Sequence, residues 1–497
     1  MTSSSLGFRL PRVLAGLLLF TAILADGCGS GGGSGTSTPP AVPPSTPPAY
    51  STRAVCVATP HTDGRAKWTI LIYMQAANNL QPYSIQNIAQ LASVGSNSNV
   101  NIVVQWKQIP AAITNSCPNC APTFYGVRRY YIHAHSAADV TAIANGNTTV
   151  LQGDRLPDPT GTTPVNTAGM PDTLPDPNGK PNGTLDMGSW HALADFVKWG
   201  TTTYPADHLA VLVWDHGSGW QNVYRSAAVK AVPARAVAVD DETQNEIETW
   251  ELPGALATAA QPIDMIIFDA SLEQMTEVAY QLRNSAKIMV GSEESPPAPG
   301  YPYDKWVGDL EADLGNDTPC DLGNHIIQEF INYPAYVNST NGYASELTQS
   351  MVDLGRMGQV ATALNTLAGT LNQHILDQQN LIYRLRLDPT YPDRTQGGAQ
   401  HYTTTYRDFK DLWDYCDLIR TASAPSNMQQ AAAGVQNALI GPTGAILENA
   451  HGPLGQDGSH GLSIYVPDPG SYLTTYSNLS ITQAAPLWSR FLVNQVK

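Results

Sequence analysis

The stretch that decides the fold class runs from His208 to Trp220 and reads His-Leu-Ala-Val-Leu-Val-Trp-Asp-His-Gly-Ser-Gly-Trp. Its first part, Leu209 to Trp214, is a continuous apolar run, which is typical of a strand buried on both faces of a mostly parallel sheet. Asp215 and His216 follow at once, and glycines come after them. Open α/β sheets place their active sites where such strands end. We therefore expect this strand in the middle of a parallel sheet, with His216 in a functional site.

A second strand of the same build ends in polar residues of its own. Ile263 to Phe268 is a short apolar run, and Asp269, Ala270 and Ser271 follow it. A histidine at one strand end and a nucleophile-type residue at the neighbouring one form the pattern of a catalytic dyad, in which the histidine acts as the base. His216 and Ser271 are therefore candidate catalytic residues.

The segments around these two strands predict an α/β fold. Trp68 to Met74 and Val100 to Trp106 read as buried strands with a helix, Tyr83 to Val94, between them, and such strand-helix-strand units build parallel sheets. The C-terminal third reads as largely helical and returns a late strand at Gly461 to Val466. The apolar spacing predicts further helices over Trp190 to Tyr204, Glu246 to Thr258, Leu272 to Asn284, His325 to Phe330, Leu354 to Arg386 and Asp408 to Arg420. We therefore expect a mostly parallel sheet flanked by helices.

Composition and motif spacing exclude several classes of partner and cofactor. The chain has 497 residues, of which 14% are charged, and its formal net charge is −16. This negative charge argues against nucleic acid and against an anionic membrane surface as partners. Cys117 and Cys120 have C-x-x-C spacing, but no second cysteine pair or histidine pair follows at zinc-ligand spacing, so we expect no metal or other cofactor.

One acidic loop, from Asn145 to Asp186, offers oxygen ligands for a calcium ion. Its spacing differs from that of an EF-hand loop, so we favour a solvated loop over a calcium site. The candidate ligands are Asp172, Asp176, Asn178, Asn182 and Asp186.

The N-terminus reads as the export signal of a lipoprotein. Arg9 and Arg12 precede the apolar run Val13 to Ala25, which is too short for a membrane span. Leu24-Ala-Asp-Gly-Cys28 resembles a bacterial lipoprotein box, although ordinary cleavage near Ala25 would leave Cys28 unmodified. We expect an exported protein held in the bacterial cell envelope by a lipid on Cys28, with no other membrane contact.

These features divide the chain into four parts. Residues 1–27 form the signal peptide, and residues 28–66 form a Gly/Ser/Pro-rich tether without an apolar pattern. Residues 67–310 form a catalytic-type core, and residues 311–497 form the helical region with the final strand. Cys117 and Cys120 fit a local disulfide in an exported protein. The pairing of Cys56, Cys320 and Cys416 stays open.

Several stretches, in order along the chain, resemble the clostripain-like cysteine peptidases (peptidase family C11). Asp215 to Trp220 corresponds to the histidine motif of that family, and Asp269 to Leu272 corresponds to its nucleophile motif. The resemblance extends over nearly the whole chain after the tether, through Trp68 to Leu80, Val290 to Trp306 and Gly461 to Pro467. It implies a caspase-type α/β fold and a hydrolase that cleaves peptide or protein substrates at Arg or Lys.

The resemblance also implies roles for individual residues. His216 would be the general base, and the backbone amides of Gly217 and of residue 271 would form the oxyanion hole. Asp269 would lie in the specificity pocket, where its carboxylate would favour Arg or Lys before the cleaved bond.

The same resemblance implies a processing site. Family members are activated by self-cleavage after a basic residue downstream of the histidine. In this chain Lys230 lies in a polar linker, Gln221 to Ala238, of the kind that is exposed and easily cut. Arg225 and Arg235 are the reserve sites.

The chain departs from the family at the nucleophile position, because family members have cysteine where this chain has Ser271. A cysteine is a few per cent thiolate at neutral pH, whereas a serine hydroxyl is a far weaker acid and needs a base that a third group holds in place. Asp215 adjoins His216, but adjacent strand residues point to opposite sides, so it is a poor candidate for that third group. Ser271-Leu-Glu-Gln274 also fits a capping box, so starting a helix would explain the serine.

Structural explanations stay open for the other candidates as well. His216 could be a hydrogen-bonded structural histidine. Asp269 could cap the helix that follows it or pair with a buried arginine. Glu293, Glu294 and Asp304 could line the same pocket, although we favour solvated loop carboxylates.

Three hypotheses therefore stand. The first is a peptidase-family hydrolase that works weakly with serine. The second is a pseudopeptidase that keeps the fold and the pocket in order to bind Arg- or Lys-bearing peptides. The third is a structural cell-envelope lipoprotein with a vestigial pocket. We favour membership of the family with low or absent peptidase activity.

Overall fold

The computed structural model describes most of the chain from residue 53 onward. The described residues are 53–57, 59–109, 123–156, 185–221, 237–313, 315, 317–387, 397–402, 406–468 and 470–495. They belong to one compact unit, Pro48–Lys497. The predictions that fall outside them concern the signal peptide, Cys28, Cys117, Cys120, Arg225, Lys230 and Arg235.

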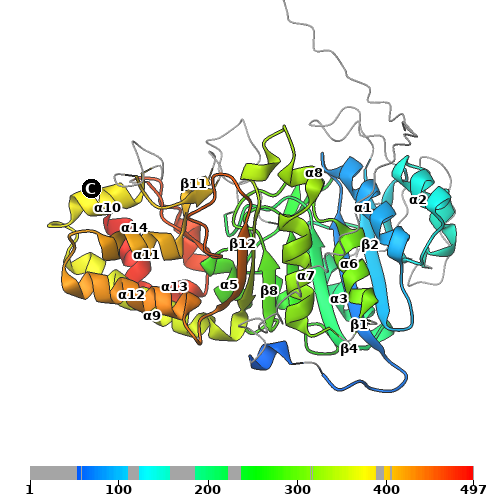
Figure 1. Cartoon of the computed structure of the whole chain (residues 1–497), viewed down its shortest axis with the longest axis horizontal. Coiled ribbons are helices and arrows are strands. Elements are labelled where there is room, and N and C mark those ends of the chain that lie inside the picture. The colour runs from blue at the N-terminus through cyan, green and yellow to red at the C-terminus, as the bar shows by residue number, and fades with distance from the viewer. Residues whose placement is uncertain are drawn as a thin grey trace, which may run out of the picture. The chain divides into compact units, whose positions relative to one another are not determined.

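The described residues form an eight-stranded central sheet (Figure 1). In order across the sheet, its strands are β12 (Ile446–His451), β9 (Thr348–Asp353), β8 (Ile288–Gly291), β7 (Met265–Asp269), β4 (Ala206–Trp214), β1 (Ala66–Gln75), β2 (Val100–Gln108) and β3 (Gly126–Tyr131). The strands from β8 to β2 run parallel to one another. β3 and β9 run antiparallel to their neighbours. The predicted mostly parallel sheet is confirmed, and β4 lies in its middle.

The apolar run of β4 is continuous because both faces of the sheet are covered. Leu209, Val211 and Val213 face one hydrophobic core, and Ala210, Leu212 and Trp214 face the other. The first core includes residues of α3 (Trp190–Thr203), α5 (Thr276–Leu282) and α9 (Met357–Gln373). The second includes residues of α1 (Gln81–Val94), α6 (Tyr303–Ala312) and α7 (Pro319–Ile331).

The C-terminal region is helical, as predicted, but it also contributes strands that the sequence did not indicate. Its helices from residue 357 onward are α9, α10 (Gln379–Leu385), α11 (Leu412–Thr421), α12 (Ser426–Ile440), α13 (Ile481–Ala484) and α14 (Pro486–Asn494), drawn at the left of Figure 1. The late strand is β13 (Ser463–Tyr465), which pairs with β11 (Tyr406–Asp411) in a separate antiparallel sheet that also holds β10 (His401–Tyr402). The helix predicted from Asp408 is therefore wrong in its first residues, because β11 occupies them and the helix begins at Leu412.

A second predicted helix, Glu246 to Thr258, is also wrong in its first half. Asn245–Ile247 is strand β6, which pairs with β5 (Val237–Asp240), and the helix is the short α4 (Leu252–Leu256). Pairing with β5, which follows the linker, satisfies the backbone N–H and C=O groups of β6. These groups would otherwise need the hydrogen bonds of a helix.

One disulfide joins the N-terminal segment to the fold. Cys56, in the short 3-10 helix η2 (Ala54–Cys56), is bonded to Cys320 at the start of α7. This pairing was left open by the sequence, because the two cysteines are 264 residues apart. Cys416 is buried and free. No helix among the described residues has the length and apolarity that a membrane crossing requires.

Candidate active site

A cavity of about 250 Å³ lies where β1, β4 and β7 end. It brings together three of the residues singled out from the sequence: His216 after β4, and Asp269 and Ser271 at the end of β7. They meet because β4 and β7 are parallel neighbours, with Trp214 opposite Asp269. The full lining is Leu80, Trp214, Asp215, His216, Asp269, Ser271, Ser295, Pro296, Pro297, Ala298 and Gly300.

The Ser271 turn does not start a helix. Helix α5 begins at Thr276, its N-cap is Met275, and no side chain caps it. The predicted capping box is therefore wrong, and so is the idea that Asp269 caps this helix. Ser271 instead sits in a tight turn between β7 and α5, where it is partly exposed.

The residue after Ser271 holds an unusual backbone conformation. Leu272 has a φ of 66°, a region that costs a branched side chain about 1–3 kcal/mol and persists only where the surroundings impose it. The Leu272 side chain is completely buried, and its amide donates to the carbonyl of Glu294 at 3.3 Å. Tertiary packing therefore imposes the turn that presents Ser271 to the cavity.

Glu273 ties the Ser271 turn to the loop that follows His216. Its buried carboxyl accepts hydrogen bonds from the amides of Gly219, at 3.1 Å, and Ser218. Burial raises the pKa of Glu273 well above its usual range, although these two bonds lower it. The loops are in direct contact, since a Cβ on Gly217 would lie only 2.4 Å from the carbonyl oxygen of Ser271. Glycine is therefore required at position 217.

His216 is held by a residue that the sequence analysis did not single out. Its Nε2 lies 2.7 Å from Oδ1 of Asn79, in the turn that follows β1. An amide oxygen only accepts, so in this contact Nε2 of His216 is the donor. The strand-end rule that identified His216 also applies to β1, whose end is Gln75-Ala-Ala-Asn-Asn-Leu80, and could have found Asn79.

The carboxylate of Asp215 is held by Asn78 and by strand β5, as its place next to His216 on an extended chain allows. Its carboxylate accepts hydrogen bonds from Nδ2 of Asn78, at 2.5 Å, and from the amide of Val239. It therefore connects β4 to β5, the strand that follows the linker, and does not orient the histidine.

Asp269 is buried without a charged partner. Its Oδ2 accepts hydrogen bonds from the Tyr301 amide at 3.1 Å and the Tyr303 hydroxyl at 2.7 Å, and no arginine or lysine among the described residues pairs with it. Burial raises the pKa of Asp269 to about 6, against the lowering effect of these bonds. Gly300 has a φ of 72°, and a Cβ there would lie 2.6 Å from Asp269 Oδ2. Glycine at position 300 therefore keeps the carboxylate reachable from the cavity.

Two of the three neighbouring acidic residues differ from the prediction of solvated carboxylates. Glu293 and Glu294 are buried, and neither lines the cavity. Glu293 accepts a hydrogen bond from the amide of Gly461 at 2.9 Å, which joins the loop after β8 to the segment before β13. Asp304 is partly exposed and pairs with Lys305.

Strand β5 contacts residues next to the site, although it directly follows the linker. The amide of Val239 donates to Asp215, and its carbonyl accepts from Asn78 at 3.1 Å. Asn78 and Asp215 adjoin Asn79 and His216 in sequence, so the backbone of Val239 in β5 supports the two turns that carry Asn79 and His216. Ala238, at the same place, has a φ of 56° and is fully buried.

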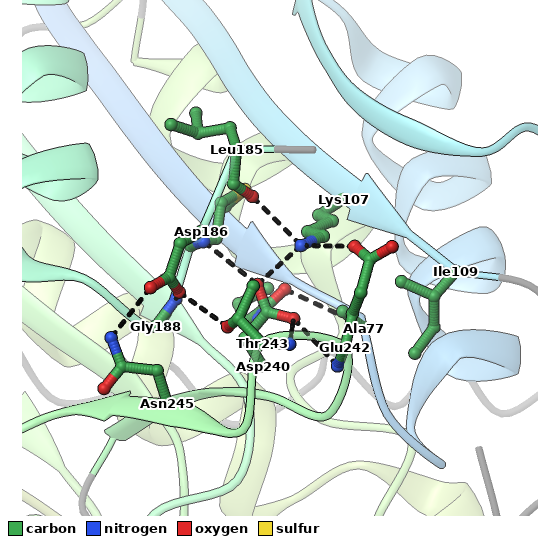
Figure 2. Close-up of polar contacts among 12 residues, drawn as sticks. Ala77, Lys107, Ile109, Leu185, Asp186, Gly188, Asp240, Glu242, Thr243 and Asn245 are labelled. Atoms are coloured by element: carbon green, nitrogen blue, oxygen red, sulfur yellow. Dashed lines mark hydrogen bonds and ion pairs between the residues drawn. The ribbon is translucent and has the colours of Figure 1, made fainter. Parts of the chain in front are cut away.

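A buried lysine fastens the far end of β5 (Figure 2). Lys107 Nζ lies 2.6 Å from Asp240 Oδ2, 2.8 Å from Glu242 Oε2 and 3.0 Å from the carbonyl oxygen of Leu185. Burial alone would lower the pKa of Lys107, but the two carboxylates outweigh it and leave the pKa raised. Asp186 lies beside this group and accepts hydrogen bonds from Thr243, Gly188 and Asn245.

Replacing Lys107 with methionine is expected to destabilise the fold by about 3–5 kcal/mol, because it leaves buried carboxylates without their cation. Lys305→Met is the matched control: its ion pair with Asp304 is half exposed, and such surface pairs contribute about 0–1 kcal/mol. Urea unfolding followed by circular dichroism measures both. Equal, small losses for the two variants would show that Lys107 contributes no more than a surface lysine.

The described residues contain no group of three or more His, Cys, Asp or Glu side chains placed to hold a metal. Of the five proposed calcium ligands, only Asp186 belongs to the described residues, and both of its carboxylate oxygens accept hydrogen bonds from protein groups.

A mostly parallel sheet flanked by helices, with a histidine after one strand and a candidate nucleophile after its neighbour, has the architecture of the caspase-like α/β proteins. The chain belongs to the clostripain family, whose family model matches residues 72–493. Clostripain from Hathewaya histolytica is 25% identical over 330 residues, which make up 59% of this chain and 59% of that protein. This chain therefore matches less than two thirds of that relative's length.

Two solved structures share the fold. The first is a secreted C11 cysteine protease from Bacteroides thetaiotaomicron in complex with an irreversible peptide inhibitor, with a TM-score of 0.54, 15% identity and coverage of 84% of this chain and 99% of that one. The second is an inactive zymogen C11 protease from Parabacteroides distasonis, with a TM-score of 0.52, 19% identity and coverage of 85% and 99%. At these identities the likeness shows the fold alone.

Proposed function

We propose that this protein binds polypeptides through an Arg or Lys side chain in the cavity, and that Ser271, at the nucleophile position, leaves peptide cleavage weak or absent. The observation that carries the proposal is Asp269, a buried carboxyl group that lines the cavity with no cation beside it among the described residues. An unpaired buried carboxylate is costly, so a cationic ligand side chain stabilises it.

The remaining parts of a peptidase site are proposed around the same cavity. His216 acts as the base, and the amides of Gly217 and of residue 271 bind the oxygen of the substrate carbonyl. The contact between the Gly217 and Ser271 backbones supports this assignment. Asn79 Oδ1 accepts a hydrogen bond from the imidazole of His216.

Location and domain organisation follow the sequence analysis. We propose an exported protein, with a signal peptide over 1–27, a tether over 28–66 anchored by lipid at Cys28, a catalytic-type core over 67–310 and a C-terminal region over 311–497. The Cys56–Cys320 disulfide supports export, since disulfides persist in oxidising compartments.

Binding is tested with short peptides that end in Arg, Lys or alanine, each added to the natural protein. Trp214 lines the cavity, so its fluorescence is expected to change when a basic peptide enters. Arg- and Lys-ending peptides should bind, and the alanine-ending peptide should not. If all three fail to bind, the cavity is vestigial and the protein is a structural envelope lipoprotein.

The linker gives a further prediction, that the natural chain stays whole whereas Ser271→Cys cuts itself after Lys230. While the linker is uncut, its basic residue can approach Asp269, because opposite charges attract. Only a nucleophile that cleaves the linker can release this residue from the cavity. Intact-mass measurement of the two proteins decides this. The control is Ser271→Cys combined with His216→Ala, which should remain whole.

Two other outcomes of that measurement are informative. Cleavage after Arg225 or Arg235 would move the processing site within the linker. A natural protein already split after Lys230, with His216→Ala uncut, would contradict the expectation that Ser271 does not cleave peptide bonds.

A further inference from the structure

We infer that Tyr303 is a specificity-determining residue, and that it makes the cavity prefer a lysine side chain to an arginine side chain. The inference rests on the proposed function, because it takes Asp269 as the group that receives the cationic side chain of a bound polypeptide. It deepens that function, because it selects one of the two basic residues and assigns the choice to the hydrogen bonds that the carboxyl group already makes.

The two oxygens of the Asp269 carboxyl group have different surroundings. Oδ2 accepts hydrogen bonds from the Tyr301 amide at 3.1 Å and from the Tyr303 hydroxyl at 2.7 Å. Oδ1 accepts no hydrogen bond from a described residue, and the carboxyl group lines the cavity. A carboxylate oxygen offers about two lone pairs. Oδ2 is therefore saturated by the protein, and Oδ1 is the oxygen left for a ligand.

The segment that supplies these hydrogen bonds is itself held in place. The buried Tyr301 hydroxyl donates to the carbonyl of Phe268 at 2.8 Å and accepts from Nε2 of Gln349 at 2.6 Å. The hydroxyl of Tyr336 donates to the carbonyl of Gly300 at 2.5 Å. Moving the segment would leave these buried polar groups without partners, which is costly. Oδ2 therefore keeps both of its donors when a ligand enters the cavity.

An arginine side chain is poorly matched to a carboxylate with one open oxygen. A guanidinium group binds a carboxylate best through two parallel N–H···O bonds, one to each oxygen. Asp269 offers Oδ1 alone, so arginine loses one bond of this pair. The guanidinium also carries five N–H donors, and each donor that is buried without an acceptor weakens binding.

A lysine side chain needs one oxygen only. Its ammonium group is a compact charge with three N–H donors that rotate to suit their acceptors. The approach to Oδ1 is open, because a Cβ at position 300 would lie 3.0 Å from this atom and glycine has none. Burial raises the pKa of Asp269, and the bonds from Tyr301 and Tyr303 lower it, so these bonds also favour the charged form that an ammonium group binds.

The test uses short peptides that differ only in their last residue, which is lysine, arginine or Nε-trimethyl-lysine. Isothermal titration calorimetry at pH 8 measures the Kd of each peptide with the natural protein. Lysine should bind about tenfold more tightly than arginine, the scale of one hydrogen bond to a charged group. Trimethyl-lysine keeps the charge but has no N–H to donate to Oδ1, so it should bind more weakly than lysine. If charge alone decided binding, the three peptides would bind alike.

Tyr303→Phe tests the residue that occupies Oδ2. The variant removes one donor and frees a lone pair for the second N–H of a guanidinium group, so the preference for lysine should fall from about tenfold to about onefold. The ratio of the two Kd values is the readout, because a change in the charge of Asp269 affects both peptides. Tyr73→Phe is the matched control: it removes a buried hydroxyl that donates to the carbonyl of Met187 at 2.8 Å, away from the cavity. It should leave the ratio unchanged.

The outcomes separate this inference from the proposed function. If neither the lysine nor the arginine peptide binds the natural protein, the proposed function fails. If both bind and arginine binds as tightly as lysine or more tightly, the inference fails alone. A folded Tyr303→Phe protein that keeps the natural ratio overturns the role of Tyr303. If this variant does not fold, the three peptides on the natural protein still decide whether Oδ1 alone receives the ligand.

Discussion

Ser271→Cys is expected to raise cleavage of peptides after Arg or Lys by on the order of 10³-fold, the scale on which one activated catalytic group changes a rate. The expected gain has a chemical cause. A thiol beside an imidazole ionises readily, so the attacking group depends less on losing its proton during the attack. The protein around position 271 needs no change, since His216 and the buried carboxyl of Asp269 already line the same cavity.

The measurement compares both proteins on short fluorogenic peptides that end in Arg, Lys or alanine. Ser271→Ala serves as the matched control, because it changes the same atom without creating a nucleophile. Circular dichroism and thermal unfolding confirm that each variant is folded. A folded Ser271→Cys protein that stays as inactive as Ser271→Ala would show that the surrounding groups do not form a peptidase site.

The second large effect concerns Asp269 in the Ser271→Cys background. Asp269→Ala is expected to lower kcat/KM on Arg peptides by about 10²-fold, equivalent to about 3 kcal/mol, and to leave alanine peptides nearly unchanged. The reason is that the substrate cation would lose the buried carboxylate that the cavity offers. Equal losses of kcat/KM on both peptides would show that Asp269 does not determine the preference for Arg.

Asp269 also predicts a pH dependence in the same assay. Its pKa is about 6 in the fold, so the carboxyl is neutral below that pH and binds a cation poorly. KM for Arg peptides should therefore fall as the pH rises through about 6, and KM for alanine peptides should not. Asp269→Asn should abolish this difference between the two substrates.

The same pKa has a consequence for stability. A buried acid whose pKa is raised from 3.8 to about 6 favours the folded state below about pH 4, and this contribution is lost as the pH rises through 6. Asp269→Asn should therefore stabilise the ligand-free protein at pH 8 by up to about 3 kcal/mol, taking 1.36 kcal/mol per pKa unit. A basic peptide should stabilise the natural protein at pH 8, where the charge is unpaired.

The sequence by itself determined the parallel sheet and which strand ends face the cavity. Apolar runs such as Leu209 to Trp214 can only be satisfied by burial on both faces, and parallel strands end at one edge. His216, Asp269 and Ser271 therefore had to approach one another once β4 and β7 became neighbours. The family resemblance added the expected role of each residue and marked Ser271 as the departure.

The antiparallel parts of the fold were decided by tertiary structure. β9 (Thr348–Asp353) and β12 (Ile446–His451) carry mixed polar and apolar residues, and they become strands because the edge of the parallel sheet supplies hydrogen-bond partners. β11 precedes α11 for the same reason, since it pairs with β13, which lies far along the chain. The spacing of apolar residues within a segment does not indicate which distant strand that segment will pair with.

Tertiary structure also decided the arrangement of the residues in the site. Ser271-Leu-Glu-Gln274 has the letters of a capping box, yet Leu272 is packed into the core at a positive φ and Glu273 bonds to the loop after His216, so the helix starts later. Asn79 holds His216 across more than a hundred residues of chain. Residue types predict what a side chain can do, but only the contacts made on folding decide which neighbour it has, because the free energy of a buried turn depends on groups that are distant in sequence.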